Sequence, residues 1–213
     1  ADFSEDNLNR LTFTYQPTTP HFIPMWGVKQ LENIPFEAGK QYDIKTINLL
    51  RAEAKIHVSL RQDMIDGGYT LTQVKLLGHQ QQGYCLPPFA SVSHLEDANR
   101  LSDADMGHFH EAAPSQEPVD MLQGDVYVPE YRNSGEGTPA VISLRLRDRF
   151  GKESDYLLKF VDYDASGAPT SQAVDILRNH YYQFQLYKGE NDILHVNLNV
   201  RKWYYTEHDH IIM

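Results

Sequence analysis

One acidic segment carries side chains of the type that bind calcium. From Asp162 and Asp164 to Gly167 it begins like a calcium loop, in which oxygen ligands at alternate positions precede a glycine at a sharp turn. Such a loop ends in a bidentate glutamate, but Ala173 stands at that position. A polar turn between two strands explains the segment more simply, and calcium at Asp162 and Asp164 stays open.

Histidine pairs are the second candidate set of ligands. His108 and His110, and likewise His208 and His210, are two residues apart, which places both imidazoles on one face of a strand, as a zinc or copper site requires. No third ligand is recognisable, and ten histidines make such pairs easy to obtain by chance. The sequence therefore predicts no metal centre and no cofactor.

The residue patterns of common catalytic sites are absent from the sequence. It has no Gly-x-Ser-x-Gly nucleophile turn, no phosphate-binding glycine loop and no Cys-x-x-Cys pair. Its one cysteine, Cys85, has no recognisable partner motif, and none of the many carboxylates lies in a glycosidase motif. We therefore expect a protein that is not an enzyme.

Aromatic side chains suggest a different activity. Trp203, Tyr204 and Tyr205 could stack on the apolar faces of pyranose rings, and Trp26 is a further candidate. Aromatic residues of β-sandwiches also fill the core and its rim. A surface glycan-binding β-sandwich module is therefore the alternative function.

Composition excludes further classes of protein. The chain of 213 residues has 19 Lys and Arg against 29 Asp and Glu, and this formal charge of −10 disfavours nucleic acid and anionic membranes as partners. No apolar run reaches the roughly 18 residues of a membrane helix. The sequence begins at Ala1 without a signal segment, and we expect Ala1 to be a processed or trimmed end.

Alternation of apolar and polar residues predicts that strands must position these side chains, because successive side chains of a strand point to opposite faces. The last two runs flank a short polar turn and predict an antiparallel hairpin. Long helices are absent from the pattern, so the sequence predicts an all-β fold. The predicted strands are residues 11–15, 54–60, 69–77, 125–128, 140–147, 156–161, 181–187 and 193–203.

A long polar interruption predicts a domain boundary. Pro87 and Pro88 and the polar residues 91–117 separate the strands by about thirty residues, which is long for a loop inside a compact domain. We therefore expect an N-terminal β-domain at residues 1–88 and a C-terminal β-sandwich at residues 89–213.

Four segments, in order along nearly the whole chain, resemble the fimbrillin superfamily of Bacteroidetes, the type V pilins and their minor subunits. The most specific is residues 175–182, followed by the terminal hairpin that ends at Trp203. The segments are Ile23-Pro24-Met25-Trp26-Gly27, residues 49–56, residues 126–131, and residues 175–182 with that hairpin.

The resemblance implies two transthyretin-like antiparallel β-sandwich domains, export as a lipoprotein precursor, and assembly into a fimbrium attached to the outer membrane at the cell surface. It implies no catalysis. In such pilins a donor strand from one subunit fills a groove of the next by β-augmentation, in which backbone hydrogen bonds give the pairing and alternate side chains fix the register. The expected partners are other fimbrial subunits, and a host or bacterial surface protein or glycan.

The resemblance also assigns residues to roles. The strand-exchange candidates are Tyr204, Tyr205, Ile211, Ile212 and Met213. We expect structural roles for Arg51 at the entrance of its strand and for a turn whose side chains bond to the backbone beside the final hairpin. The structural residues are Trp26, Arg51, Arg178, Asn179, His180 and Trp203.

Two departures from the family pattern modify these expectations. Only twenty-two residues precede the segment that starts at Ile23, so the N-terminal domain is expected to be truncated. The residues after Trp203 alternate poorly, because Glu207 to His210 are polar on both faces. A minor, tip or accessory adhesin subunit is therefore at least as well supported as a stalk subunit.

Overall fold

The computed structural model describes residues 5–15, 22–27, 37–42, 47–88, 106–189 and 193–203. These residues form an all-β fold, as the sequence predicts. The helices in the described ranges, α1 (Glu5–Asn9) and α2 (Gln62–Asp66), have five residues each.

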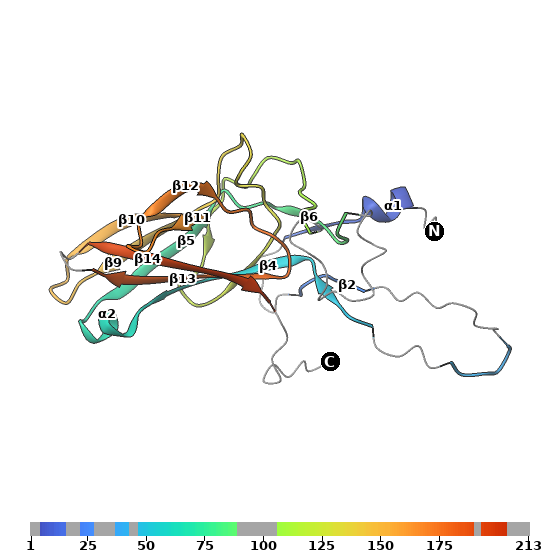
Figure 1. Ribbon diagram of the computed structural model, residues 1–213, viewed down its shortest axis with the longest axis horizontal. Helices are drawn as coiled ribbons and strands as arrows, with labels where there is room; N and C mark the ends of the chain where they lie inside the picture. Colours follow the sequence, from blue (N-terminus) through green and yellow to red (C-terminus); the bar gives the residue numbers. More distant parts are fainter. Residues whose placement is uncertain are drawn as a thin grey trace.

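Two four-stranded sheets pack face to face and form a sandwich (Figure 1). In the first sheet the parallel pairing of β4 and β13 joins two antiparallel pairs, whereas the second sheet is antiparallel throughout. The first sheet has the order β14 (Leu194–Lys202), β13 (His180–Lys188), β4 (Glu53–Leu60) and β8 (Val126–Pro129). The second has the order β10 (Glu153–Lys159), β9 (Val141–Arg147), β5 (Thr70–Leu77) and β7 (Val119–Asp120).

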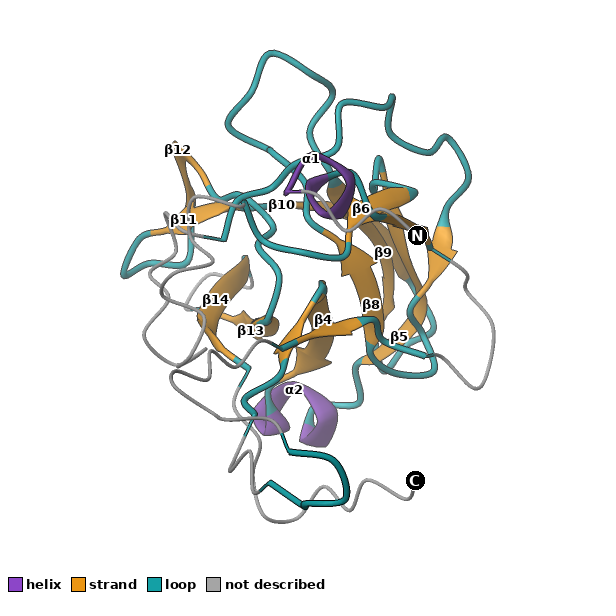
Figure 2. Ribbon diagram, turned by 90° about the vertical axis from the view of Figure 1, so that its right-hand side faces the viewer, coloured by secondary structure: helices purple, strands orange, loops and turns teal. Residues whose placement is uncertain are grey.

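Three two-stranded ribbons extend the sandwich. They pair β1 (Thr12–Thr14) with β6 (Gln82–Tyr84), β2 (Met25–Trp26) with β3 (Leu50–Arg51), and β11 (Val161–Tyr163) with β12 (Pro169–Ala173). Helix α1 and strands β2 and β6 lie at one end, which we call the near end, and α2 lies at the opposite, far end (Figure 1). Figure 2 views the molecule from the near end.

Alternate side chains from both sheets meet in one hydrophobic core. These residues point inward at period two, so the sequence pattern specifies the core face of β4, β9 and β13. The fully buried members include Ala54, Ile56, Leu76, Val128, Ile142, Leu144, Tyr182, Phe184 and Leu186.

Most strand predictions are confirmed. Strands β4, β5, β8 and β9 correspond to the predicted residues 54–60, 69–77, 125–128 and 140–147. The terminal hairpin is also confirmed, because β13 and β14 pair antiparallel from His180↔Lys202 to Lys188↔Leu194. The run predicted at 156–161 is divided between two strands, β10 ending at Lys159 and β11 beginning at Val161.

The boundary predicted between residues 88 and 89 falls inside the sandwich. Strands β4 and β5 precede it, yet β4 pairs with β8 and β13, and β5 pairs with β7 and β9. Because these strands share hydrogen bonds and one core, the division into residues 1–88 and 89–213 does not follow the sheets. The stretch that suggested it lies largely outside the described residues.

Candidate functional site

A buried ion pair lies at the near end of the sandwich. Arg178 and Glu130 have side chains that are each 1% exposed. The Nε and Nη2 groups of Arg178 donate to Glu130 Oε2 at 2.9 and 2.7 Å, and the Arg178 backbone N–H donates to Oε1 at 3.1 Å. The carboxylate is thus held by three donors of one residue, a charge-assisted arrangement.

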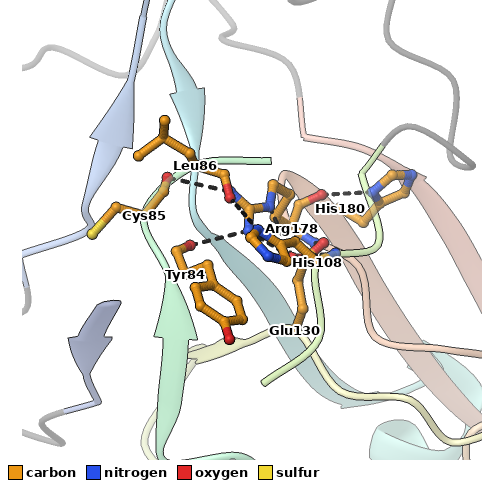
Figure 3. A network of polar contacts seen from close by, with 7 residues as sticks. All are labelled: Tyr84, Cys85, Leu86, His108, Glu130, Arg178 and His180. Carbon is orange, nitrogen blue, oxygen red and sulfur yellow. Dashed lines mark hydrogen bonds and ion pairs between the residues drawn. The ribbon is translucent and has the colours of Figure 1, made fainter. Parts of the chain in front are cut away.

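The same guanidinium also contacts the two-stranded ribbon of β1 and β6. Arg178 Nη1 donates to the carbonyl of Cys85 at 3.2 Å, and Nη2 donates to the carbonyl of Tyr84 at 3.0 Å (Figure 3). Tyr84 is the last residue of β6, and Cys85 is the residue after it. Arg178 therefore joins β6, the end of β8 and the segment before β13.

Histidines complete this network. The His108 backbone N–H donates to Glu130 Oε2 at 3.2 Å, and His108 Nδ1 donates to the carbonyl of Leu86 at 3.0 Å. The His108 ring stacks on Tyr84 with centroids 3.8 Å apart. His180 Nδ1 donates to the carbonyl of Arg178 at 2.8 Å. Figure 3 shows these side chains converging on Arg178 from separate segments of the chain.

Burial changes the proton affinity of groups in and beside this network. Desolvation lowers the pKa of His108, and the positive charge of Arg178 acts in the same direction. Desolvation raises the pKa of the Cys85 thiol, an effect that Arg178 partly opposes. A thiol that is half-buried and held protonated is a poor nucleophile, so the site offers no activated cysteine.

A second cluster lies beside the first, around Asn179. Its φ angle is 54°, the left-handed conformation that asparagine tolerates better than most residues. The Asn179 N–H donates to the Glu53 carbonyl at 2.8 Å, and its own carbonyl accepts from the Trp203 N–H at 2.6 Å. Arg51 Nη1 donates to Asn179 Oδ1 at 3.3 Å and to the Trp203 carbonyl at 2.9 Å.

The Trp203 ring is packed against neighbouring side chains. The Arg51 guanidinium lies 4.2 Å from the ring centroid, and the Tyr127 ring stacks at a centroid distance of 5.3 Å. These contacts give Trp203, the residue after β14, a packing role. A glycan stacked on Trp203 would therefore compete with Arg51 and Tyr127 for the surface of the indole ring.

The predicted structural residues fall into three places. Arg51, Asn179 and Trp203 are in mutual contact, and Arg178 and His180 belong to the adjoining network. Trp26 pairs with Leu50 in the ribbon of β2 and β3, and its buried indole N–H has no hydrogen-bond partner among the described residues. The strand-exchange candidates Tyr204, Tyr205, Ile211, Ile212 and Met213 lie outside the described residues.

The candidate calcium loop is an internally bonded turn. Asp164 Oδ1 accepts from the Ser166 N–H at 2.8 Å, from Ser166 Oγ at 2.6 Å and from the Ala168 N–H at 3.0 Å. The Ser166 hydroxyl is the main cause of a lowered pKa at Asp164. In the described ranges no three His, Cys, Asp or Glu side chains are grouped as a metal site would need. His208 and His210 lie outside these ranges.

Sequence reasoning missed Glu130 and Tyr84, and it considered His108 only as a metal ligand and not as a member of this network. Glu130 stands inside the segment 126–131 that carried the resemblance, but no role was assigned to it. A buried arginine requires a carboxylate, which could have prompted a search for one. The choice among 29 acidic residues, however, depends on tertiary structure.

The four segments of the resemblance meet at this end of the sandwich. β2 pairs with β3, Arg51 contacts Asn179 and Trp203, Glu130 holds Arg178, and Tyr131 forms a two-way backbone bridge with Ile176. The arrangement binds these segments to one another and holds Trp203, the residue after β14, so it is a structural junction.

Comparisons with known proteins give structural likenesses only. No protein-family model matches the chain, and no curated protein matches it. The chain is similar to provisionally named cell adhesion proteins from Parabacteroides distasonis (17% identity, TM-score 0.43, 73% of this chain and 53% of that one) and Bacteroides uniformis (8%, 0.41, 75% and 54%). A third, from Bacteroides fragilis, has 13% identity and a TM-score of 0.39 over 75% of this chain and 48% of that one. The chain spans about half the length of these structures.

Within the described ranges, no helix has the length and apolar character needed to span a membrane.

Proposed function

We propose that the protein is a non-enzymatic subunit of a cell-surface fimbria or related adhesive structure, exported as a lipoprotein precursor and joined to its neighbours by β-strand addition. The observation that carries the proposal is the meeting of the four fimbrillin-like segments in one junction of backbone pairings and polar side-chain contacts. Segments that hold one another in place are expected of proteins that share a structural subunit fold. Proteins that share a catalytic site would instead have reactive groups gathered in a cleft.

The position of Trp203 supports strand addition. β14 forms an edge of its sheet, and Trp203 follows its last residue, Lys202. Because Arg51 and Asn179 hold Trp203, the donor segment proposed at residues 204–213 would start from a fixed point. A fixed starting point lowers the entropy cost of pairing with a neighbouring subunit.

Exposed apolar side chains supply a surface that strand addition would cover. They belong to the near-end ribbons or to residues next to them, and Phe22 is 82% exposed. Leu11, Met25 and Leu49 are exposed as well. Apolar surface next to strand edges favours pairing with another chain, which an added strand would satisfy.

Shearing the native protein from the cell surface tests the proposal. We expect an unboiled SDS gel, probed with an antibody to this chain, to show a ladder of multimers. Ile211→Asp together with Ile212→Asp should abolish the ladder, because carboxylates cannot fill apolar pockets of a groove. Asp209→Asn is the matched control in the same segment and should keep the ladder. A single band from the unmodified protein would refute assembly by strand addition.

A further inference from the structure

The ribbon of β11 and β12 lies on the side of the sandwich where β10 and β14 are the edge strands of the two sheets. An edge strand presents backbone N–H and C=O groups on which a strand of another chain can pair, so natural proteins cover or interrupt their edges. On this side the ribbon forms hydrogen bonds with both edge strands.

On β10 the ribbon caps the backbone of Lys159. The Tyr163 hydroxyl accepts from the Lys159 N–H at 3.1 Å and donates to the Lys159 carbonyl at 2.9 Å. Residues of β10 point alternately toward β9 and away from it, and the Asp148 N–H donates to the Lys152 carbonyl at 2.9 Å, so Lys152 points toward β9. Lys159 is an odd number of positions further along and therefore points to the open side. One tyrosine hydroxyl thus occupies both of its edge groups.

On β14 the turn of the ribbon covers Val196. The Val196 N–H points away from β13 and donates to the Gly167 carbonyl at 3.2 Å. The three hydrogen bonds that Asp164 Oδ1 accepts fix the shape of this turn. Turn and strand are in close contact, because a Cβ added at Gly167 would lie 2.6 Å from the Cβ of His195.

The ribbon leaves little of the two edges open. On β14 the backbone groups of Leu198 and Val200 point the same way as those of Val196, and they have no hydrogen-bond partner among the described residues. Strands usually have about five or six residues, so this remainder offers a pairing strand few hydrogen bonds. The open part of β10 carries Glu153 and Asp155, and charged side chains on an edge also disfavour pairing.

The ribbon also covers apolar side chains between the sheets. Val161 is only 9% exposed, and Tyr163 and Val174 pack against the hydrophobic core. If the ribbon moved away, these side chains would be uncovered together with the backbone groups of Val196 and Lys159. Another chain would then find hydrogen-bonding groups and apolar surface at the same place.

We infer that the ribbon of β11 and β12 is a guard that keeps this side of the sandwich from pairing with a second copy of the chain. Copies associate side by side, through β10 and β14, once the ribbon opens. The guard depends on two contacts, Tyr163 with Lys159 and Gly167 with Val196. The inference goes beyond the proposed function, because it concerns the edges of the two sheets and requires no donor segment.

Asp164→Ala tests the inference, because it removes the acceptor that fixes the turn of the ribbon. Amide hydrogen exchange should become about tenfold faster at Val196 and Lys159, since both N–H groups lose their cover. Sedimentation velocity of the full chain at about 0.1 mM should then show more association than the unmodified protein does, as a small interface requires such concentrations.

Asp148→Ala is the matched control. Asp148 Oδ1 accepts from the backbone N–H groups of Phe150 and Lys152, both at 2.9 Å, so the substitution loosens a turn of the same kind that lies between β9 and β10. It should leave association and the exchange of Val196 unchanged. Tyr163→Phe removes only the hydroxyl and should speed exchange at Lys159 but not at Val196.

Three results would overturn the inference. The first is faster exchange at both amides in Asp164→Ala without added association, because an open edge would then be harmless. The second is unchanged exchange of Val196 in both Asp164→Ala and Gly167→Ala, because the ribbon would then not shield the strand. The third is equal association of Asp148→Ala, which would assign the effect to general destabilisation. The multimer ladder depends on residues 204–213, so failure here is distinguishable from failure of the proposed assembly.

Discussion

Arg178 and Glu130 form an ion pair with 2.7 Å between Nη2 and Oε2, and each side chain is 1% exposed. Removing two charges from water is costly, and the cost is recovered only where the remaining donors and acceptors are satisfied. Here the carbonyls of Tyr84 and Cys85 accept further hydrogen bonds from the guanidinium, and the His108 backbone N–H donates to the carboxylate. The pair is therefore the centre of a network that a single substitution would leave unbalanced.

Glu130→Gln should lower the free energy of unfolding by about 3–5 kcal/mol, because it leaves a buried guanidinium without its countercharge. Urea denaturation measures the loss. The double variant Glu130→Leu with Arg178→Met should lose less free energy of unfolding than the sum of the losses in Glu130→Leu alone and Arg178→Met alone, since no unpaired charge remains. Additive losses would show that the two side chains do not act as a pair.

Asn179→Ala should lower the free energy of unfolding by about 1–2 kcal/mol, because alanine is strained at a φ of 54° and cannot accept from Arg51. Asn179→Gly removes the same side-chain contact without the backbone strain and should cost less. Thermal melting of both variants provides the comparison. A melting temperature for Asn179→Ala equal to that of the unmodified protein would remove Asn179 from its structural role.

Gly167→Ala should be more destabilising than Gly151→Ala. Both glycines have a positive φ, 75° and 84°, so both substitutions carry backbone strain of about 1 kcal/mol. Only at Gly167 would the added Cβ also meet neighbours, His195 Cβ at 2.6 Å and the Val196 nitrogen at 2.9 Å, whereas nothing lies within 4 Å at Gly151. We expect the difference in unfolding free energy to exceed about 1 kcal/mol. Equal losses in the two variants would mean that the turn at Gly167 can move away from His195 and Val196 at little cost.

Stability should decrease as the pH falls below about 6.5. Burial lowers the pKa of His79 and of His108 in the folded protein, so between the folded and unfolded pKa values the unfolded chain binds more protons. The stabilisation is fully present above the unfolded pKa, near 6.5, and is lost as the pH falls toward the folded values.

Urea denaturation at pH 7.5 and pH 5.5 measures this dependence. A His79→Phe and His108→Phe double variant should show a smaller decrease between these two pH values, although its stability at pH 7.5 can also differ. The ring of a phenylalanine keeps the contact with Tyr84 without a titrating nitrogen. An unchanged decrease would assign the pH dependence to other groups.

The sequence by itself determined most of the long strands and their faces. Alternation in residues 54–60, 140–147 and 181–187 is a local property, and one polar turn suffices to specify the hairpin of β13 and β14. It also singled out Arg51, Arg178, Asn179 and Trp203, since their segments resemble, in the same order, those of a known family.

Only the tertiary structure decided which strands are neighbours and which side chains meet. β4 pairs in parallel with β13, and Arg51 contacts Asn179 across 128 positions of sequence. Arg178 could have paired with any of 29 acidic residues, and burial at the near end selected Glu130. Period-two patterns fix the face of a strand but not its partner, because partners are chosen by packing and hydrogen bonding between segments that are far apart in the chain.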